Sequence, residues 1–375
     1  MNMHEKVLWL QTEFPELWQA MDDANHNFSI HDLNPYHLEG RVSTHTLMVA
    51  KIAEIYNENE IIQWAALLHD LGKPLARIEI PEKRRARFVN HEGISMFLAI
   101  DILNKTDLST DDKIQVLKVI AGHSLLFDLL IIKDENTIDI NDDVYKLFKG
   151  QKTFLDLVSR ITRCDTLGRF AKGADARTHL GDSIVPAIQN ILPKFIDQDS
   201  LDYNEKDKAL ILLCGLPGSG KSSYVNLLND DYFIISRDSI LEAMATKMGI
   251  TYNDVFALHL VDHKIKEEID INLNMMINDS KKSGKHIVID MTNLSKKARR
   301  RWTNRYDKSY KKECIVFLTG QADLIDRDNN RSKTGKTIGA DVYLSMMKSF
   351  SLPMFSDGFD NIDYILHEGT YNKNG

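Results

Sequence analysis

Hydrophobic residues follow two different rhythms along the 375-residue chain. In residues 1 to about 195, apolar positions recur at the three- to four-residue spacing of amphipathic helices, without any alternation of strands and helices. The clearest such stretches are Leu47–Tyr56, Ile61–Leu71, Ile94–Leu103 and Lys113–Ala121. This pattern predicts an almost wholly helical first half.

The rhythm changes after a polar, acidic stretch, and we interpret residues 196–208 as a linker. Short apolar runs of strand length follow, with helical stretches between most of them. They are Leu210–Cys214, Tyr232–Ile235, His286–Asp290, Cys314–Thr319 and Ile362–Leu366. The alternation is typical of a doubly wound α/β fold with a parallel sheet. We therefore expect two domains, an all-α domain at 1–195 and an α/β domain at 209–375.

Composition sets limits on the class of protein. Hydrophobic residues make up 43% and charged residues 27%, which is ordinary for a soluble globular protein. Because the formal net charge is −7, nucleic acid can be bound only by local basic patches. The odd set Cys164, Cys214 and Cys314 is interpreted as reduced thiols. Charges interrupt residues 1–19, and no apolar run approaches the roughly 18 residues of a membrane span, so we expect a cytoplasmic protein without a membrane partner.

Residues 215–222 fit the pattern G-x-x-x-x-G-K-[ST], between an apolar strand and a helical stretch. The glycines allow backbone N–H groups to face phosphate oxygens, and the helix N-terminus adds partial positive charge. Lys221 can reach the β- and γ-phosphates, and the Ser222 hydroxyl can ligate Mg²⁺. The motif predicts a site for ATP or another NTP with Mg²⁺; the alternative is a glycine-rich turn with a surface lysine. The expected nucleotide-binding residues are Gly215, Pro217, Gly218, Ser219, Gly220, Lys221, Ser222, Ser223 and Arg327.

Polar residues follow the next two strands, where open α/β sheets place their sites. The Asp238 carboxylate can accept the proton of an attacking hydroxyl. Alternatively it caps the following helix, a role that Ser239 could take instead. Asp290, Thr292 and Asn293 are expected at the same edge of the sheet.

The most basic stretch of the chain comes next. Residues 281–312 contain twelve Lys and Arg against Asp290 and Asp307, a net charge of +10. In an acidic chain this segregation indicates a surface for a polyanion. Trp302 and Tyr306 could stack on bases, or pack within the domain.

Arg327 and Arg331 are spaced to share one helix face, where planar cations suit a transferring phosphoryl group. Their position before a glycine-rich loop favours a lid; a salt-bridged surface helix is the alternative. With these residues, 209–367 resembles the polynucleotide 5′-kinase family of P-loop phosphotransferases. The matching pieces are Gly215–Ser222, Arg237-Asp238, Asp290–Asn293 and the arginine pair.

The kinase resemblance implies roles for particular residues. Asp238 would be the base, Arg331 would clamp the phosphoryl oxygens, and Arg237 would contact the acceptor strand together with Asn293. Phage-type kinases carry an acceptor-binding arginine one turn after the base, where this chain has Leu241. Basic residues after Asn293 would substitute for it. The expected acceptor-binding residues are Arg237, Asp290, Thr292, Asn293, Arg300 and Arg301.

The helical half carries its own candidate chemistry in His45, His69, Asp70, His91, His123 and Asp165. The pair His69-Asp70 ends an apolar helical run, where buried polar groups need compensation that a metal would supply. Imidazole and carboxylate ligands suit Mn, Fe, Co, Ni, Cu or Zn and do not select among them. A metal lowers the pKa of bound water, and two metals can clamp the attacking and leaving oxygens of a phosphate. Taken singly, any of these histidines could be a surface or core residue.

The joint pattern over about residues 30–180 resembles the HD phosphohydrolase superfamily, an all-helical fold named for its adjacent His-Asp pair. The resemblance implies one metal on His45, His69, Asp70 and Asp165, and a second on His91 and His123, bridged by Asp70. It also implies that Lys73 contacts phosphate as part of the catalytic site. The basic run Lys83, Arg84, Arg85 and Arg87 could attract an anionic substrate, or form a solvated face.

The whole chain resembles the bifunctional HD-Pnk enzymes of RNA end healing. The resemblance implies that the first domain removes 2′,3′-cyclic, 2′- or 3′-phosphates from RNA ends, and that the second phosphorylates the 5′-OH. A separate RNA ligase would seal the ends, because no nucleotidyl-transfer lysine motif is evident. Two alternatives stay open: an HD nucleotidase beside a nucleoside or metabolite kinase, and an HD half that binds metal or RNA without turnover. The +10 segment disfavours the first and the complete ligand set disfavours the second.

Overall fold

The computed structural model describes residues 1–134, 137–172, 181–197, 208–332 and 337–368. The chain divides into two compact units. The first comprises Met1–Leu201 and Met347–Leu352, and the second Asp202–Met346 and Pro353–Gly375. As expected, a helical unit is followed by an α/β unit with a parallel sheet.

Helix α4 (Glu60–Leu68) is the central element of the first unit. The Asn59 side chain caps it by accepting a hydrogen bond from the backbone N–H of Ile62, and all residues from Trp64 to Leu68 are buried. Because its apolar residues face in all directions, neighbouring helices enclose it. Those in contact with it are α3 (Val42–Ile55), α6 (His91–Leu103), α7 (Thr110–Gly122) and α9 (Lys152–Leu167). The end of α4 therefore delivers His69 and Asp70 into the interior.

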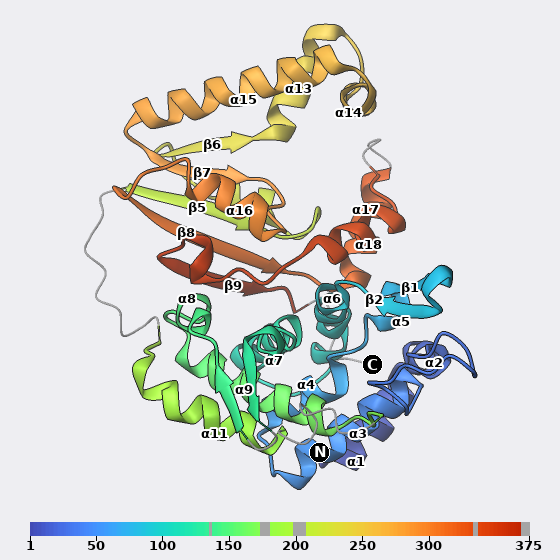
Figure 1. The fold of residues 1–375 in the computed structure, drawn as a ribbon. Helices are drawn as coiled ribbons and strands as arrows, with labels where there is room; N and C mark the ends of the chain where they lie inside the picture. Colours follow the sequence, from blue (N-terminus) through green and yellow to red (C-terminus); the bar gives the residue numbers. More distant parts are fainter. Residues whose placement is uncertain (135–136, 173–180, 198–207, 333–336, 369–375) are drawn as a thin grey trace. The chain divides into compact units, whose positions relative to one another are not determined.

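The other helices of this unit are shorter or more peripheral (Figure 1). They are α1 (Met3–Glu13), α2 (Pro15–Asp23), α5 (Lys73–Ala76), α8 (Asp143–Leu147) and α11 (Gly181–Ile191).

The expectation of an almost wholly helical first half is wrong at two hairpins. Strand β1 (Arg77–Ile80) pairs antiparallel with β2 (Arg85–Phe88), and β3 (Leu130–Asp134) pairs antiparallel with β4 (Thr137–Ile140). Strands of four or five residues are too short to establish a clear alternating pattern. The basic run at 83–87 therefore lies in the turn and second strand of a hairpin, with Arg84 in the left-handed region at φ 45°.

The second unit is built on five parallel strands in the order β6-β7-β5-β8-β9 (Figure 1). They are β5 (Lys208–Cys214), β6 (Tyr232–Ser236), β7 (His286–Asp290), β8 (Tyr310–Leu318) and β9 (Asn361–Leu366). Parallel neighbours end at one edge of the sheet, so the loops after β5, β6 and β7 converge there.

Helices complete the α/β unit, with α13, α14 and α15 gathered beside edge strand β6 (Figure 1). The helices are α12 (Lys221–Val225), α13 (Arg237–Met248), α14 (Tyr252–Val261), α15 (His263–Ser283), α16 (Lys296–Thr303), α17 (Gln321–Ser332) and α18 (Ala340–Ser349), the last of which passes into the first unit at Met347. In the described ranges, none of the helices is both long and apolar enough to cross a membrane.

Part of the basic segment at 281–312 is structural. Arg299 is fully buried, and its Nε and Nη2 each lie 2.8 Å from a carboxylate oxygen of Asp357. Trp302 and Tyr306 are buried as well, so these rings pack within the unit and are not exposed for stacking on bases. The three cysteines are buried and unpaired.

Candidate functional site

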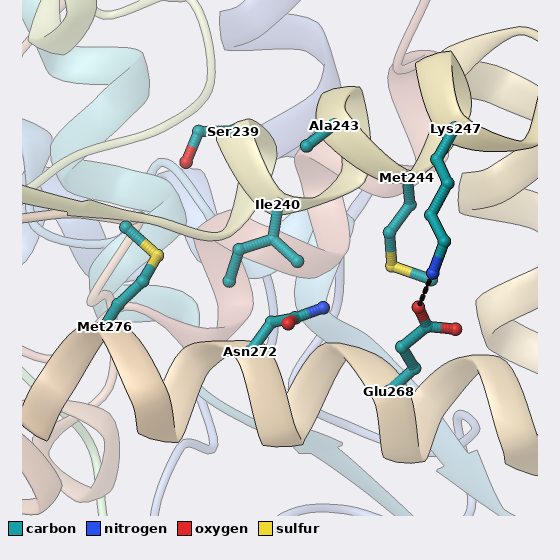
Figure 2. A pocket seen from close by; sticks show the side chains of 8 residues that line it. All are labelled: Ser239, Ile240, Ala243, Met244, Lys247, Glu268, Asn272 and Met276. Carbon is teal, nitrogen blue, oxygen red and sulfur yellow. Dashed lines mark hydrogen bonds and ion pairs between the residues drawn. The ribbon is translucent and has the colours of Figure 1, made fainter.

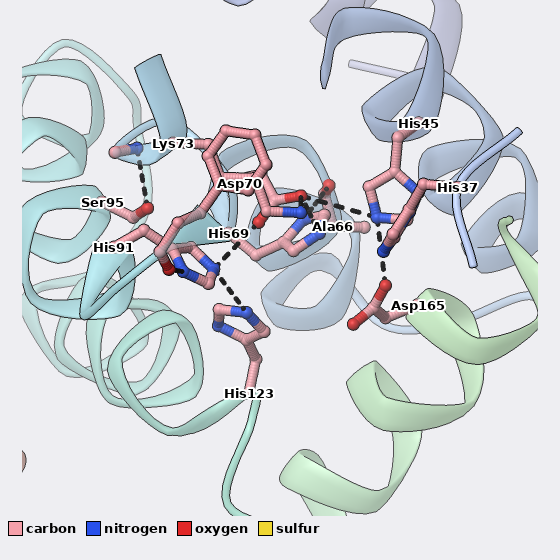
Figure 3. A network of polar contacts seen from close by, with 12 residues as sticks. His37, His45, Ala66, His69, Asp70, Lys73, His91, Ser95, His123 and Asp165 are labelled. Carbon is pink, nitrogen blue, oxygen red and sulfur yellow. Dashed lines mark hydrogen bonds and ion pairs between the residues drawn. The ribbon is translucent and has the colours of Figure 1, made fainter. Parts of the chain in front are cut away.

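Five helices of the first unit bring the six expected metal-binding side chains to one place (Figure 3). His45 belongs to α3, His69 and Asp70 follow α4, His91 opens α6, His123 follows α7, and Asp165 lies near the end of α9. Gly72 makes this convergence possible. A Cβ atom there would lie 2.4 Å from the carbonyl oxygen of His91 and 2.7 Å from the backbone nitrogen of Ser95. Only glycine therefore lets the turn after Asp70 meet the start of α6.

Asp70 lies at the centre of the cluster. Its Oδ1 is 3.1 Å from Nε2 of His91, and its Oδ2 is 3.1 Å from Nε2 of His69 and 3.5 Å from Nε2 of His45. The donors form two adjacent groups that could each hold a metal ion. These groups are His45, His69 and Asp165, and Asp70, His91 and His123.

Each of the four histidines is held through its other ring nitrogen. The partners of Nδ1 are the carbonyl oxygens of Ala66 (3.0 Å from His69), Phe88 (3.1 Å from His91) and Ile120 (2.7 Å from His123), and the Glu39 carboxylate (3.1 Å from His45). In His69, His91 and His123, donation from Nδ1–H fixes the tautomer and leaves Nε2 as a potential metal ligand. Nδ1 of His45 has only an ion-pair contact with Glu39, outside hydrogen-bond geometry. All four Nε2 atoms meet around Asp70 and Asp165 (Figure 3).

The cluster fits a cation. Both carboxylate oxygens of Asp70 and the Nε2 atoms of His45 and His69 are buried without a partner in hydrogen-bond geometry, although both Nε2 atoms lie within 3.5 Å of Oδ2 of Asp70. Each such atom costs about 1–3 kcal/mol, and one or two cations at the centre would satisfy them together. Burial opposes the charge on Asp70, but His69 and Lys73 outweigh it and hold its pKa well below the usual range. An ionised carboxylate is the form that binds metal.

Lys73, expected to contact phosphate, is also at the centre. Its Nζ forms an ion pair with Oδ2 of Asp70 at 2.7 Å and donates a hydrogen bond to Nε2 of His26 at 2.9 Å. Because Nδ1 of His26 donates to the carbonyl oxygen of Gly40 at 3.0 Å, its Nε2 is an acceptor. The ammonium group is thus held between the metal-type cluster and a buried neutral imidazole.

Sequence reasoning missed His26, His37 and Glu39. The Glu39 carboxylate lies 2.8 Å from Nδ1 of His37 as well as 3.1 Å from His45, and burial lowers the pKa of His37 to about 4. Although these residues could offer a third group of metal ligands, both ring nitrogens of His26 are engaged. We assign them to an outer layer that orients His45 and Lys73. The only sequence feature that pointed to these three residues was the occurrence of two histidines and a glutamate shortly before α3.

In the second unit, the phosphate loop joins β5 to α12. Gly218 and Gly220 have φ angles of 82° and 103°, which L side chains rarely adopt. The Lys221 ammonium donates to the carbonyl oxygens of Gly215 at 2.8 Å and Leu216 at 2.7 Å, so it lies across the loop. Of the other expected nucleotide-binding residues, Ser219 is buried, Pro217 is half-buried, and Ser222 and Ser223 are exposed.

Arg327 is tied to the same loop. Its Nη1 donates to the carbonyl oxygen of Gly218 at 2.7 Å, and its Nη2 lies 2.6 Å from Nε2 of His367. This places a cation of α17 beside the phosphate loop. Arg331 belongs to the last turn of α17, but its side chain lies outside the described residues.

Asp238 lies in the first turn of α13, directly after β6. Ser236 caps this helix by accepting from the backbone N–H of Ser239, so neither alternative cap, Asp238 or Ser239, holds. The exposed Asp238 carboxylate instead accepts a hydrogen bond from the Tyr252 hydroxyl at 2.8 Å. Arg237 is half-buried beside it.

Asp290 ends β7, the strand next to β6 and β5. Burial raises its pKa, Lys221 acts in the opposite direction, and Asp238 raises it further. The three charged groups are therefore within electrostatic reach of one another at this edge of the sheet.

Thr292 and Asn293 connect the loop after β7 to the end of β5 and the start of the phosphate loop. The Thr292 carbonyl oxygen accepts from the backbone N–H of Gly215 at 3.0 Å. Buried Asn293 has a φ of 45° and donates from its amide to the carbonyl oxygens of Leu213 at 2.8 Å and Met291 at 3.4 Å. The contact of Asn293 with an acceptor would use an amide that is here engaged with the backbone.

Arg300 and Arg301 are exposed on α16 and line a surface hollow with Lys296 and Lys297. No Asp or Glu lines that hollow among the described residues. Leu241, in the place of the phage-type arginine, is buried. Helix α16 therefore adds exposed positive charge to that of Lys221, Arg237 and Arg327.

Helices α13 and α15 enclose a pocket of about 400 Å³ that begins one residue after Asp238 (Figure 2). Its walls are half apolar and half polar, and they include an amide and an ion pair. The lining residues are Ser239, Ile240, Ala243, Met244, Lys247, Glu268, Asn272 and Met276.

Comparisons with known proteins agree with this division. Residues 42–159 match the model of the HD domain family, and residues 210–353 match a model described as an AAA domain. The multifunctional CCA protein of Azoarcus sp. (strain BH72) is 25% identical over 153 residues, 41% of this chain and 36% of that protein. That of Hahella chejuensis (strain KCTC 2396) is 34% identical over 89 residues, 24% of this chain and 18% of that protein. The chain thus spans little more than a third of the first relative and less than a fifth of the second.

Among solved structures, a protein proposed to be a kinase from Chloroflexus aurantiacus j-10-fl aligns with a TM-score of 0.31 and 15% identity. The alignment covers 43% of this chain and 86% of that one. The family matches and the fold agree on an HD-type domain followed by a P-loop domain with similarity to the AAA family.

Proposed function

We propose that this protein heals broken RNA ends with two active sites. The HD domain removes 2′,3′-cyclic, 2′- or 3′-phosphate, and the P-loop domain transfers the γ-phosphoryl group of ATP or another NTP to the 5′-OH. The observation that carries the proposal is the exposed cationic face of α16, which follows directly on the loop after Asp290. Four cations along one helix can contact successive phosphates of a polynucleotide backbone, whereas a small metabolite is too short to contact all four.

The kinase reaction follows from the residues at the sheet edge. Asp238 takes the proton of the 5′-OH, the oxygen attacks the γ-phosphorus, and the bond to the β–γ bridging oxygen breaks so that the nucleoside diphosphate leaves. Lys221 stabilises negative charge on the transferring group, with Arg331 as the expected second cation. Ser222 would hold Mg²⁺, which neutralises phosphate charge when bound.

In the HD domain, the ligand set around Asp70 would hold one or two transition-metal ions (Mn, Fe, Co, Ni, Cu or Zn). Such ions acidify water and polarise phosphate oxygens when bound. Lys73 presents its ammonium group to the negative charge that gathers on the phosphate as water adds and a ribose oxygen leaves. Glu39 and His26 keep His45 and Lys73 oriented for this step.

A second candidate is an HD nucleotidase joined to a nucleoside or metabolite kinase. The pocket between α13 and α15 favours it, because a hollow of about 400 Å³ beside the base would accept one small molecule. The two candidates predict different salt responses: phosphate contacts along RNA weaken steeply with ionic strength, and single nucleosides lack them.

The test gives the protein an RNA with 5′-OH and 2′,3′-cyclic phosphate ends, with and without ATP and with a panel of divalent metals. We expect NTP- and Mg²⁺-dependent phosphorylation of the 5′ end, and phosphate removal from the other end that needs a metal but no NTP. Efficient nucleoside phosphorylation with a flat salt response, and no action on RNA, would establish the second candidate instead. The healed ends suit a separate RNA ligase, and we place this work in the cytoplasm, away from membranes.

A further inference from the structure

Helix α14 carries a pair of aromatic rings that the kinase reaction as described does not use. Tyr252 and Phe256 are four residues apart on one face, with ring centroids 6.2 Å apart and planes inclined by 19°. The Phe256 side chain is 45% exposed. A stacked pair with one ring in water presents an aromatic face to a ligand.

The pair is tied to the reacting group. Tyr252 donates its hydroxyl hydrogen to Asp238, which we assign as the base. The start of α14 is fixed by a capping box, in which Thr251 and Asp254 bond reciprocally. The aromatic face therefore begins at the carboxylate and runs away from it along a helix with a defined first turn.

We propose that Tyr252 and Phe256 form the platform on which the 5′-terminal base of the acceptor strand stacks. The inference rests on the proposed 5′-kinase activity. The terminal base is attached to the same ribose as the 5′-OH, so it must lie within one nucleotide of Asp238. Tyr252 contacts Asp238 directly, and the Phe256 ring centroid is 6.2 Å from that of Tyr252. Stacking on an aromatic ring accepts every base, which suits an enzyme that meets RNA ends of any sequence.

The experiment compares two RNAs that differ only in their 5′-terminal nucleotide, one with its base and one abasic. Phe256→Ala is expected to lower kcat/KM roughly tenfold to hundredfold on the RNA with its terminal base, and less than about threefold on the abasic RNA. Phe256→Trp keeps a stacking face and should retain activity. Leu260→Ala, at a residue that is 67% exposed on the same helix, is the matched control and should change neither rate.

Other outcomes overturn the platform. An equal loss on both RNAs would assign Phe256 to packing, and unchanged rates on both would show that the ring is unused. A base-dependent loss in Asn272→Ala, with Phe256→Ala unaffected, would put the base in the pocket of Figure 2. If the unaltered protein phosphorylates no RNA at all, the proposed function itself is wrong, a result distinct from the others.

Discussion

The two candidate sites differ in how far the fold alone completes them. In the HD domain, His45, His69 and Asp70 are fully buried. In the P-loop domain, Asp238, Ser222 and Arg300 are exposed. One site is enclosed by helix packing, and the other is spread along the open edge of a sheet.

The partners of the charged groups sharpen this difference. Both oxygens of Asp70 are buried outside hydrogen-bond geometry and have only ion-pair contacts with Lys73 and the histidines, so the HD domain carries a cost that a metal cation would relieve. Lys221 is instead bonded to carbonyl oxygens of its own loop, and an incoming phosphate must compete with them. Packing alone brings the donor groups of the first site together, whereas Lys221 of the second site is still bonded to its own loop.

The largest effect is expected for Asp70→Ala. This change removes the residue shared by both donor groups, so phosphate release from 2′,3′-cyclic RNA ends should fall more than about 1000-fold, beyond the 10- to 100-fold typical of outer-layer partners. Phosphate release is measured with 5′-phosphorylation as the internal control. Loss of both activities would contradict the separation of the two sites.

Lys221→Ala is the reciprocal change. Loss of one charge from the transition state of phosphoryl transfer should lower the 5′-kinase rate about 100- to 1000-fold. The measurement is transfer of labelled γ-phosphate to RNA, with Lys51→Ala, an exposed lysine paired with Glu54 in the helical unit, as a control. Phosphate removal by the HD domain should be unchanged. A matching loss of that activity would contradict the assignment of the two reactions to separate sites.

The strands of the α/β unit were predictable because buried parallel strands are nearly continuous apolar runs. Strand β8 begins at Tyr310, earlier than the predicted Cys314, because Lys311–Glu313 pair with β5 through the backbone despite their polar side chains. The hairpins of the helical unit were missed for the related reason that short strands carry too few residues for a period.

Within the two sites, the sequence predicted those residues that lie next to one another in the chain and form a recognisable motif. The pair His69-Asp70 and the loop 215–222 are local signals. Glu39 and Tyr252 act through contacts with residues elsewhere in the chain, which only the fold brings together. Composition also could not say which cations face inward, and so it counted Arg299, which is buried against Asp357, among the polyanion surface.

Addition of a transition metal should raise the stability of the HD domain but not that of the P-loop domain. A transition-metal ion at 100 times its Kd should stabilise the HD domain by about 2.7 kcal/mol, because it satisfies the buried atoms around Asp70. For a unit of this size that corresponds to a rise in Tm of roughly 5–10 °C. Calorimetry with and without chelator measures the shift.

The control for that shift is Asp70→Ala, which should abolish the response to metal. The unfolding of the P-loop domain should respond to Mg²⁺ and ATP instead. If the metal ion raised the unfolding temperatures of both domains equally, its stabilising effect would not come from binding to the buried polar atoms around Asp70.

The smallest effect is expected on α16, where single cations act through diffuse attraction to phosphate. Arg300→Ala should reduce by about 1 the slope of log kcat/KM against log salt for RNA phosphorylation, with kcat at saturating RNA little changed. Titration of potassium chloride at fixed Mg²⁺ and ATP gives the slope, and Lys51→Ala should leave it as it is. If Arg300→Ala instead lowers kcat without altering the slope, this arginine contacts the reacting phosphoryl group. The edge of the sheet would then be a compact catalytic site like the HD cluster. The two domains would no longer differ in how their charged residues act on the substrate.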